Sequence, residues 1–176
     1  VGILLGFFKK LKIKVLGIDP AKNICKIANK KKIKTLHSFF DSKVSQKVIS
    51  KFGYAKIITG TNVFAHIDDM HEPMKAIKLL LEDDGVFVFE VHYLVDLLEK
   101  FQFDMIYHEH MMYHSLTAIS CLLNFFDMEI FDVLRIPIHA GSVRVHVQNK
   151  KKGKKTIEPI VNKLFDFEKT KKVDQL

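Results

Sequence analysis

"KVLGIDPAKNICKIANKKKIKTLHSF", residues 14–39, has the pattern of a strand, a helix and a second strand. Residues 14–19 form a short apolar run that ends in an acid. Pro20 then stands where a helix can begin, because the first helical residue does not need its N–H. Apolar residues follow at helical spacing, and a weaker run at 33–39 indicates the second strand. This order of elements is typical of a parallel sheet.

The alternation of strand and helix patterns continues along the whole chain. We expect helices over residues 3–12, 20–32, 42–52, within 68–81, about 93–101, 115–126 and 157–172, and strands over 14–19, 33–39, 55–60, 86–91, 129–136 and 142–147. Strands that alternate with helices predict a mainly parallel sheet with helices on both faces. The last two strands have no helix between them, which predicts a closing antiparallel hairpin. The fold class is therefore α/β and Rossmann-like, although the chain opens on a helix with no strand before it.

Lysine supplies most of the positive charge of the chain. The 176 residues, enough for one ordinary domain, carry a formal net charge of +8. Arg135 and Arg144 are the only arginines, and arginine is the preferred residue for bidentate contacts to phosphates and bases. We therefore interpret the lysines as a solvated surface and expect no nucleic-acid partner.

Cysteine use and hydropathy limit the structural class and the cellular location of the protein. Cys25 and Cys121 are far apart and form no CxxC pair, so the sequence predicts neither a disulfide framework nor a zinc knuckle. No apolar run reaches the ~18–20 residues of a membrane span, so we expect no membrane partner. The apolar start lacks a basic leader and a cleavage site, which argues against a signal peptide. The expected location is cytoplasmic.

Several polar side chains follow the expected strands, at the edge where open α/β sheets bind their ligands. Asp19 ends a strand, and its carboxylate suits either the hydroxyls of a ribose or the cap of the next helix. Asn62 and His66 follow the strand at 55–60. Glu90 lies inside an apolar strand, where an acid requires a partner or a function.

The segment "DMIYHEHMMYH", residues 104–114, concentrates histidine, tyrosine and glutamate in one place. Three interpretations are open: a proton-transfer site, a metal site, or a polar loop that caps the following helix. His110 and His114 would share one face of a helix, and three histidines can hold zinc, but "HMMYH" is not HExxH and no cysteine is close. Strict alternation along a strand would separate Glu109 from His110, so we expect a turn here.

Four segments together resemble one family: "KVLGIDPAKNI", "TNVFAHIDDMH", "GVFVFEVHYLVDLLEKFQFDMIYHEH" and "IFDVLRIPIHAGSVRVHV". They follow one another in the order found in class I S-adenosylmethionine-dependent methyltransferases. The subgroup that the chain resembles contains the C-methyltransferases of nucleotide-linked keto-deoxysugars. The similarity implies a cofactor-binding methyltransferase domain over residues 1–148, and a linker and helix over 149–176 that lead to a further domain.

The resemblance implies S-adenosyl-L-methionine as the cofactor and assigns three residues to it. Asp19 is similar to the acid that holds the ribose of the cofactor. Gly2 is similar to the last glycine of the loop that normally reads E-x-G-x-x-x-G. Asn62 is similar to a residue that lies near both cofactor and substrate. The implied partner is a nucleotide-linked sugar, and no oligomeric state is predicted.

The resemblance also implies the catalytic residues, which are His66, Tyr107, Glu109 and His110. His66 is similar to an active-site histidine, and the other three are similar to a trio that lines the sugar pocket. A carbon must lose a proton before it can attack a methyl group, and histidine is suited to take that proton near neutral pH. We therefore expect His110 to be the general base, and no metal ligand is predicted.

The chain also departs from the family. The first strand, most of the glycine loop, the N-terminal zinc module and nearly all of the C-terminal domain are absent, and in the family strand order, 3-2-1-4-5-7-6, that first strand is central. Thr61 stands where a second asparagine is common, and His92 where a proline is. We expect an internal piece of a longer protein, which alone is unstable or inactive. Three alternatives stay open: a non-catalytic remnant, an O- or N-methyltransferase, and a basic nucleic-acid binder that uses "KKKGKK".

Overall fold

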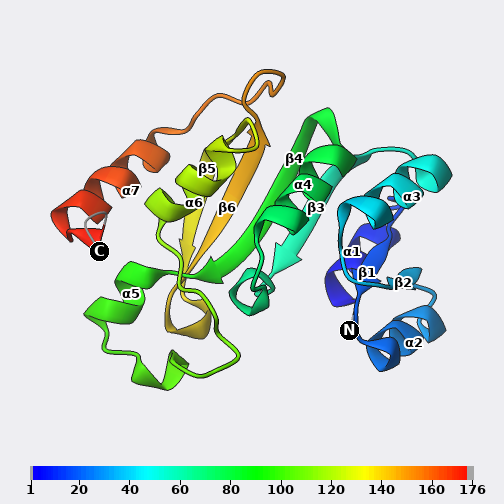
Figure 1. Cartoon of the computed structure of the whole chain (residues 1–176), viewed down its shortest axis with the longest axis horizontal. Coiled ribbons are helices and arrows are strands. Elements are labelled where there is room, and N and C mark those ends of the chain that lie inside the picture. Colours follow the sequence, from blue (N-terminus) through cyan, green and yellow to red (C-terminus); the bar gives the residue numbers. More distant parts are fainter. Residues whose placement is uncertain (1, 174–176) are drawn as a thin grey trace.

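Two β-sheets form the framework of the protein in a computed structural model, which describes residues 2–173 (Figure 1). The strands are β1 Gly17–Asp19, β2 Thr35–His37, β3 Ala55–Thr61, β4 Leu81–His92, β5 Met128–Ile136 and β6 Ser142–Asn149. The α-helices are α1 Ile3–Lys10, α2 Lys22–Lys30, α3 Ser42–Phe52, α4 His71–Leu80, α5 Leu94–Glu99, α6 Leu116–Asn124 and α7 Pro159–Thr170. Short 3-10 helices lie in the connections: η1 Phe64–His66, η2 Phe103–Met105 and η3 Ile138–Ala140. Every helix and strand expected from the sequence is present, with bounds that differ by a few residues.

Local side-chain signals set the ends of several helices. The carboxylate of Asp41 accepts a hydrogen bond from the backbone N–H of Val44 at 2.7 Å and caps the start of α3. Gly53 ends α3 with a φ of +83°, a conformation that glycine adopts without strain. Ser115 caps α6 in the same way as Asp41 caps α3. Within residues 2–173, none of the helices has the length and apolar character that crossing a membrane requires.

The larger sheet has the strand order β3-β4-β6-β5, and the smaller sheet pairs β1 with β2. The pairs β1–β2 and β3–β4 are parallel, whereas β6 runs antiparallel to both β4 and β5. This arrangement confirms the Rossmann-like α/β class and the antiparallel hairpin. β6 lies between β4 and β5, so the last strand of the chain enters the sheet beside its longest strand.

The break between the two sheets lies between β1 and β3. The two strands share no ladder, yet both pack against one apolar cluster built on Val44 and Val48 of α3 and Leu80 of α4. Ile18 of β1 and Ile58 of β3 lie on this cluster. Side-chain packing rather than backbone hydrogen bonds therefore joins the sheets. The break occurs where we expected the central strand of the family to be missing.

The main core lies around β4 and β6. Phe87 and Val91 of β4, and Val143 and Val145 of β6, are all at most 1% exposed. Phe87 stacks on Phe89 with ring centroids 4.9 Å apart. Long valine and phenylalanine runs suit a strand that is covered on both faces, which explains why β4 was the clearest strand in the sequence.

We expected the last helix to lead away from the domain. In the structure, α7 packs against the body of the protein. Val161 and Leu164 of α7 are buried in the main core. Glu168 of α7 is completely buried, and its carboxylate accepts hydrogen bonds from the backbone N–H groups of Leu116 and Thr117 at 2.6 and 2.9 Å. A residue distant in sequence therefore satisfies the first N–H groups of α6, which helices otherwise leave unpaired. The division of the chain at residue 148 stays a prediction.

Candidate active site

One edge of the larger sheet collects the connections that carry histidine (Figure 1). β3 and β4 are parallel, so η1 and His92 both lie at their carboxyl ends, and β6 is antiparallel, so η3 lies at the same edge. The segment before α6 returns to this edge, where His114 forms a bridge with Tyr93. The fold thus brings together residues far apart in sequence, at the edge expected to bind a ligand.

Four imidazole rings form a continuous cluster at this edge, which we name the histidine cluster: His66, His110, His92 and His139. The ring centroids of His66 and His110 are 5.1 Å apart, those of His110 and His92 are 4.9 Å apart, and those of His92 and His139 are 5.3 Å apart. His92 and His110 are each 7% exposed, whereas His66 and His139 are exposed. The two middle rings of the cluster, His110 and His92, are therefore buried, and the two outer rings, His66 and His139, are at the surface.

Both ring nitrogens of His110 are engaged, and the partners define its tautomer. Nδ1 lies 2.9 Å from the backbone carbonyl oxygen of Met105, which only accepts, so Nδ1 carries the proton. Nε2 is then the unprotonated nitrogen, and it accepts a hydrogen bond from the Tyr107 hydroxyl at 2.8 Å. The backbone N–H of His110 donates to the backbone carbonyl of Tyr107 at 2.9 Å, and this hydrogen bond closes the turn that the sequence predicted. The basic nitrogen of His110 thus faces the phenol.

His66 is held by the histidine segment through its backbone. Its Nδ1 donates to the carbonyl oxygen of Glu109 at 2.8 Å, and the N–H of Met111 donates to the carbonyl of Ala65, also at 2.8 Å. Glu109, which the resemblance places in the sugar pocket, therefore orients an imidazole through its backbone carbonyl. The Glu109 side chain is exposed.

His92 has an unusual environment that the sequence did not reveal. Its Nε2 atom is buried and has no hydrogen-bond partner among the described residues. Burial, together with the nearby histidines of the cluster, lowers the pKa of His92 to about 4, so its ring is neutral near pH 7. The ring of His139 lies against that of His92. The sequence signals for His92 were its place directly after the strand expected at 86–91 and its departure from the proline that is common in the family.

Glu90 has a structural partner, as an acid in an apolar strand requires. The guanidinium of Arg144, directly across the ladder from Glu90, donates to its carboxylate at 2.6 Å. The pair is partly buried, and each charge neutralises the other. Glu90 and Arg144 therefore support the sheet beside the histidine cluster, without a free charge for chemistry.

Of the three residues expected at the cofactor, Gly2 and Asp19 lie apart from the histidine cluster in the chain, whereas Asn62 lies just before η1, and each has a feature that fits a ligand. Asp19 uses Oδ1 to accept a hydrogen bond from the N–H of Ala21 at 2.7 Å, so it caps the turn into α2 and keeps a second oxygen. Asn62 has a φ of +51°, and its Oδ1 is buried without a hydrogen-bond partner among the described residues. Gly2 has a φ of +66°, and a Cβ there would lie 2.9 Å from Ile33. A donor-bearing ligand can therefore bind Asp19 and Asn62.

The metal interpretation of the histidine segment finds no support. His110 and His114 lie in a loop rather than on one helix, and His114 is buried behind the strand end. Within residues 2–173, no group of three or more histidine, cysteine, aspartate or glutamate side chains is arranged to hold a metal ion. The polar-loop interpretation is correct in one respect, because Ser115 at the end of the segment caps α6.

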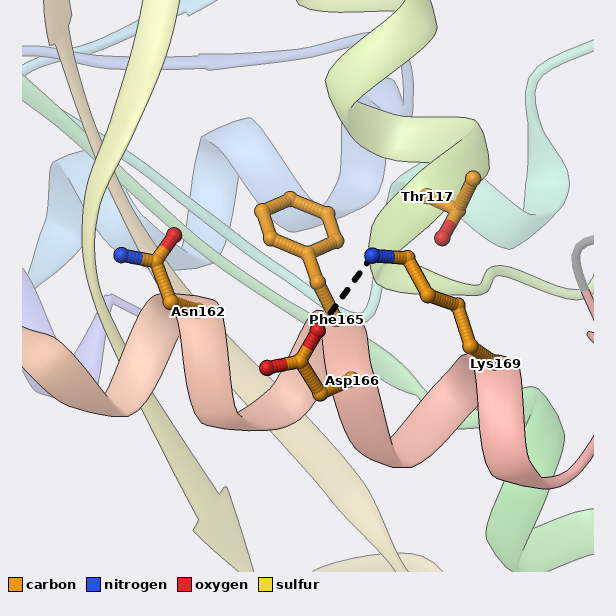
Figure 2. Close-up of a pocket in the computed structure, with 5 residues that line it drawn as sticks. All are labelled: Thr117, Asn162, Phe165, Asp166 and Lys169. Carbon is orange, nitrogen blue, oxygen red and sulfur yellow. Dashed lines mark hydrogen bonds and ion pairs between the residues drawn. The ribbon is translucent and has the colours of Figure 1, made fainter.

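A groove between α6 and α7 lies elsewhere on the surface (Figure 2). Its lining consists of Thr117, Asn162, Phe165, Asp166 and Lys169. Figure 2 shows Lys169 extended toward Asp166, and the two form an ion pair at 3.3 Å. None of the histidines of the cluster lines this groove, and we assign it no catalytic role.

Comparisons with known proteins agree with the family that the sequence resembles. A family model described as "Methyltransferase domain" matches residues 1–154. The C-methyltransferase NovU of Streptomyces niveus is 37% identical over 144 residues, which are 82% of this chain and 34% of NovU. The chain therefore spans about a third of the length of that relative.

Solved structures with low sequence identity share the fold. A SAM-dependent methyltransferase from Anabaena variabilis matches 84% of this chain and 73% of its own, with a TM-score of 0.63 and 18% identity. The 1,6-didemethyltoxoflavin-N1-methyltransferase of Burkholderia thailandensis, solved with 1,6-didemethyltoxoflavin and S-adenosylhomocysteine, matches 85% of this chain and 67% of its own. Its TM-score is 0.61 and its identity 16%.

Proposed function

The chain belongs to the methyltransferase domain family, among the class I S-adenosylmethionine-dependent methyltransferases, and from this premise we propose that it methylates a carbon atom of a nucleotide-linked keto-deoxysugar in the cytoplasm. The similarity to a C-methyltransferase supports the choice of carbon as the acceptor. The observation that carries the proposal is the tautomer of His110, whose Nδ1 donates to a backbone carbonyl and leaves Nε2 as a base.

Carbon differs from oxygen and nitrogen as a methyl acceptor because it first needs to lose a proton. S-adenosylmethionine supplies an electrophilic methyl group on its sulfonium. His110 takes the proton on the carbon next to the carbonyl through Nε2, and the Met105 carbonyl stabilises the imidazolium that forms. Tyr107 has to release Nε2 first, and its side chain, 43% exposed, has room to move.

The residues expected at the cofactor fit its chemistry. The second oxygen of Asp19 is suited to accept a hydrogen bond from a ribose hydroxyl. The buried Oδ1 of Asn62 is suited to accept from an amino group or a hydroxyl. The positive φ of Gly2 favours glycine there, so the backbone stays accessible to a ligand.

The test follows proton removal separately from methyl transfer. The full protein is incubated in D₂O with thymidine and uridine diphosphate-linked keto-deoxyhexoses, and deuterium at the carbon next to the carbonyl is measured by NMR. We expect exchange in the wild type and at least a 10²-fold slower exchange in His110→Gln. His108→Gln is the matched control, because His108 is an exposed histidine of the same loop. Exchange at the wild-type rate in His110→Gln would disprove the assignment of the base.

The affinity for the cofactor, measured by calorimetry, tests the role of Asp19 separately from that of His110. His110→Gln should bind S-adenosylmethionine as the wild type does, whereas Asp19→Ala should bind it about tenfold more weakly, the worth of one hydrogen bond to a charged group. Unchanged affinity in Asp19→Ala would leave Asp19 as a cap of α2 alone.

The divided sheet favours one alternative, a binding module without turnover. Such a protein would bind the cofactor but exchange no substrate proton. An O- or N-methyltransferase would transfer methyl groups without any proton exchange at carbon. Proton exchange therefore distinguishes the C-methyltransferase from both alternatives, and an assay of methyl transfer to the substrate separates the O- or N-methyltransferase from the binding module.

A further inference from the structure

His92, the last residue of β4, lies in the middle of the histidine cluster. Its ring contacts the rings of His110 on one side and His139 on the other. Its backbone is held in the sheet, where it is paired with Ser142 at the start of β6. A side chain on a central strand is positioned more rigidly than one on a loop.

The Nε2 atom of His92 is buried without a partner among the described residues, although the cluster around it is well bonded. A buried polar group without a partner is unfavourable relative to a bonded one, because it has lost its hydrogen bonds to water. His66 and His110 each avoid this cost, because one ring nitrogen of each donates to a backbone carbonyl. An unpaired nitrogen that persists beside a catalytic base indicates a group that bonds to a ligand.

The other hydrogen-bond donors near His110 already have acceptors. The hydroxyl of Tyr107 donates to His110 itself, and the guanidinium of Arg144 donates to Glu90. His114 also has a buried Nε2 without a partner, but among the described residues its ring makes no ring contact with the cluster. The cluster therefore offers His92 as the donor for a substrate atom next to the base.

We propose that His92 donates a hydrogen bond from Nε2 to the substrate carbonyl oxygen as that oxygen gains negative charge, an inference that rests on the proposed function. The C–H bond next to the carbonyl breaks, its proton goes to Nε2 of His110, and its electron pair forms a carbon–carbon double bond while the carbonyl π electrons move to oxygen. The hydrogen bond from His92 stabilises this oxyanion. The carbonyl is restored when the carbon bonds to the methyl group, whose bond to the sulfonium breaks with its electron pair going to sulfur, and His110 then passes its proton to solvent.

The charge state of His92 suits this task. Burial, followed by the nearby His110, His139, His66 and His114, lowers its pKa to about 4, so the ring stays neutral at the pH at which a histidine base works. A neutral imidazole donates from one nitrogen without opposing the positive charge that His110 acquires. An imidazolium at the same position would repel that charge and weaken the base.

The test compares His92→Gln with His92→Met in the full protein. The two side chains have similar length and volume, but only glutamine carries an N–H donor. We expect kcat for methyl transfer and the rate of deuterium exchange to fall about 10²–10³-fold in His92→Met. Both rates should stay within about tenfold of wild type in His92→Gln, and the affinity for S-adenosylmethionine should be unchanged in both. Circular dichroism checks folding, and His92→Phe replaces His92→Met if that variant does not fold.

Equal rates in the glutamine and methionine variants would overturn the assignment of His92, because the donor would then make no difference. Wild-type rates in both variants would overturn it as well. Neither result affects His110, whose own variant reports on proton removal. A wild-type protein that exchanges no substrate proton would overturn the proposed function itself, so the two failures are distinguishable.

Discussion

The two sheets of this protein differ in how their residues are buried. Phe87 and Val91 of β4, and Val143 and Val145 of β6, are at most 1% exposed in the larger sheet, and β4 ends in the histidine cluster. In the smaller sheet, β1 has only partly buried residues, and α1 has no buried residue. Ile3 and Phe7 of α1, and Leu11 directly after it, are 59–72% exposed.

This difference separates the two halves of the proposed chemistry. The proposed oxyanion donor ends a strand of the well-packed sheet and the proposed base contacts it, whereas Asp19 ends a strand of the smaller sheet and Gly2 precedes α1. Rigid support is needed most where atoms have to be placed within a fraction of an ångström, as in proton transfer. Each of the following measurements probes the contrast between the two regions.

The largest contrast is expected between the same substitution at two phenylalanines. Phe87→Ala removes a ring that is 1% exposed and stacked on Phe89, which should lower the free energy of unfolding by about 3–5 kcal/mol. Phe7→Ala removes a ring that is 59% exposed on α1 and should change it by about 0.5 kcal/mol or less. Urea denaturation followed by circular dichroism measures both. Equal losses would mean that α1 is buried in solution.

The next effect concerns Glu168, which connects α7 to α6 within the well-packed region. Glu168→Gln replaces one acceptor oxygen by an amide that faces N–H and O–H donors, so we expect a loss of about 2 kcal/mol in urea denaturation. Glu158→Gln, at an exposed position before α7, is the matched control and should change stability by less than about 0.5 kcal/mol. Similar losses in the two variants would show that the buried carboxylate has no special part in docking α7.

The smallest effect is a pH dependence that arises from His92. Its folded pKa of about 4 lies below the ordinary 6.5, so between these values the unfolded chain binds the proton more readily. Stability is then fully present above pH 6.5 and decreases as the pH falls toward 4, by up to about 2 kcal/mol for this group at pH 5. The loss should be smaller by that amount in His92→Gln, compared with wild type by urea denaturation at pH 7 and pH 5. Identical pH profiles would show that His92 is charged in the folded protein or solvated.

Local features of the sequence predicted most of the fold. The helix expected over 42–52 has these bounds in the structure, because capping by Asp41 and Gly53 depends on residues within one helical turn. The alternation of strands and helices gave the fold class, and the opposite faces of Glu109 and His110 predicted a turn. Glu90 was known to require a partner, but the identity of Arg144 depends on the register between β4 and β6, which no local pattern specifies.

The candidate site was predicted less completely than the fold. The histidine segment was identified from its composition, and the roles of His66 and His110 came from the resemblance and stay predictions. The position of His92 between His110 and His139 depends on how three separate connections meet at one edge of the sheet. The sequence also did not indicate that Glu168 is buried, because a glutamate on an amphipathic helix is typical of a solvated face.

The hydrogen bonds of Glu168 also determine where this chain tolerates a cut. The family similarity ends near residue 154, and a boundary drawn there by sequence alone separates α7 from the domain. Such a cut removes the carboxylate that holds the N-terminus of α6, and α6 begins two residues after His114, at the end of the histidine segment. Anyone who transplants or shortens this domain should therefore treat α7 as part of the same folding unit, because Glu168 in the last turn of that helix holds the start of α6, which follows the histidine segment.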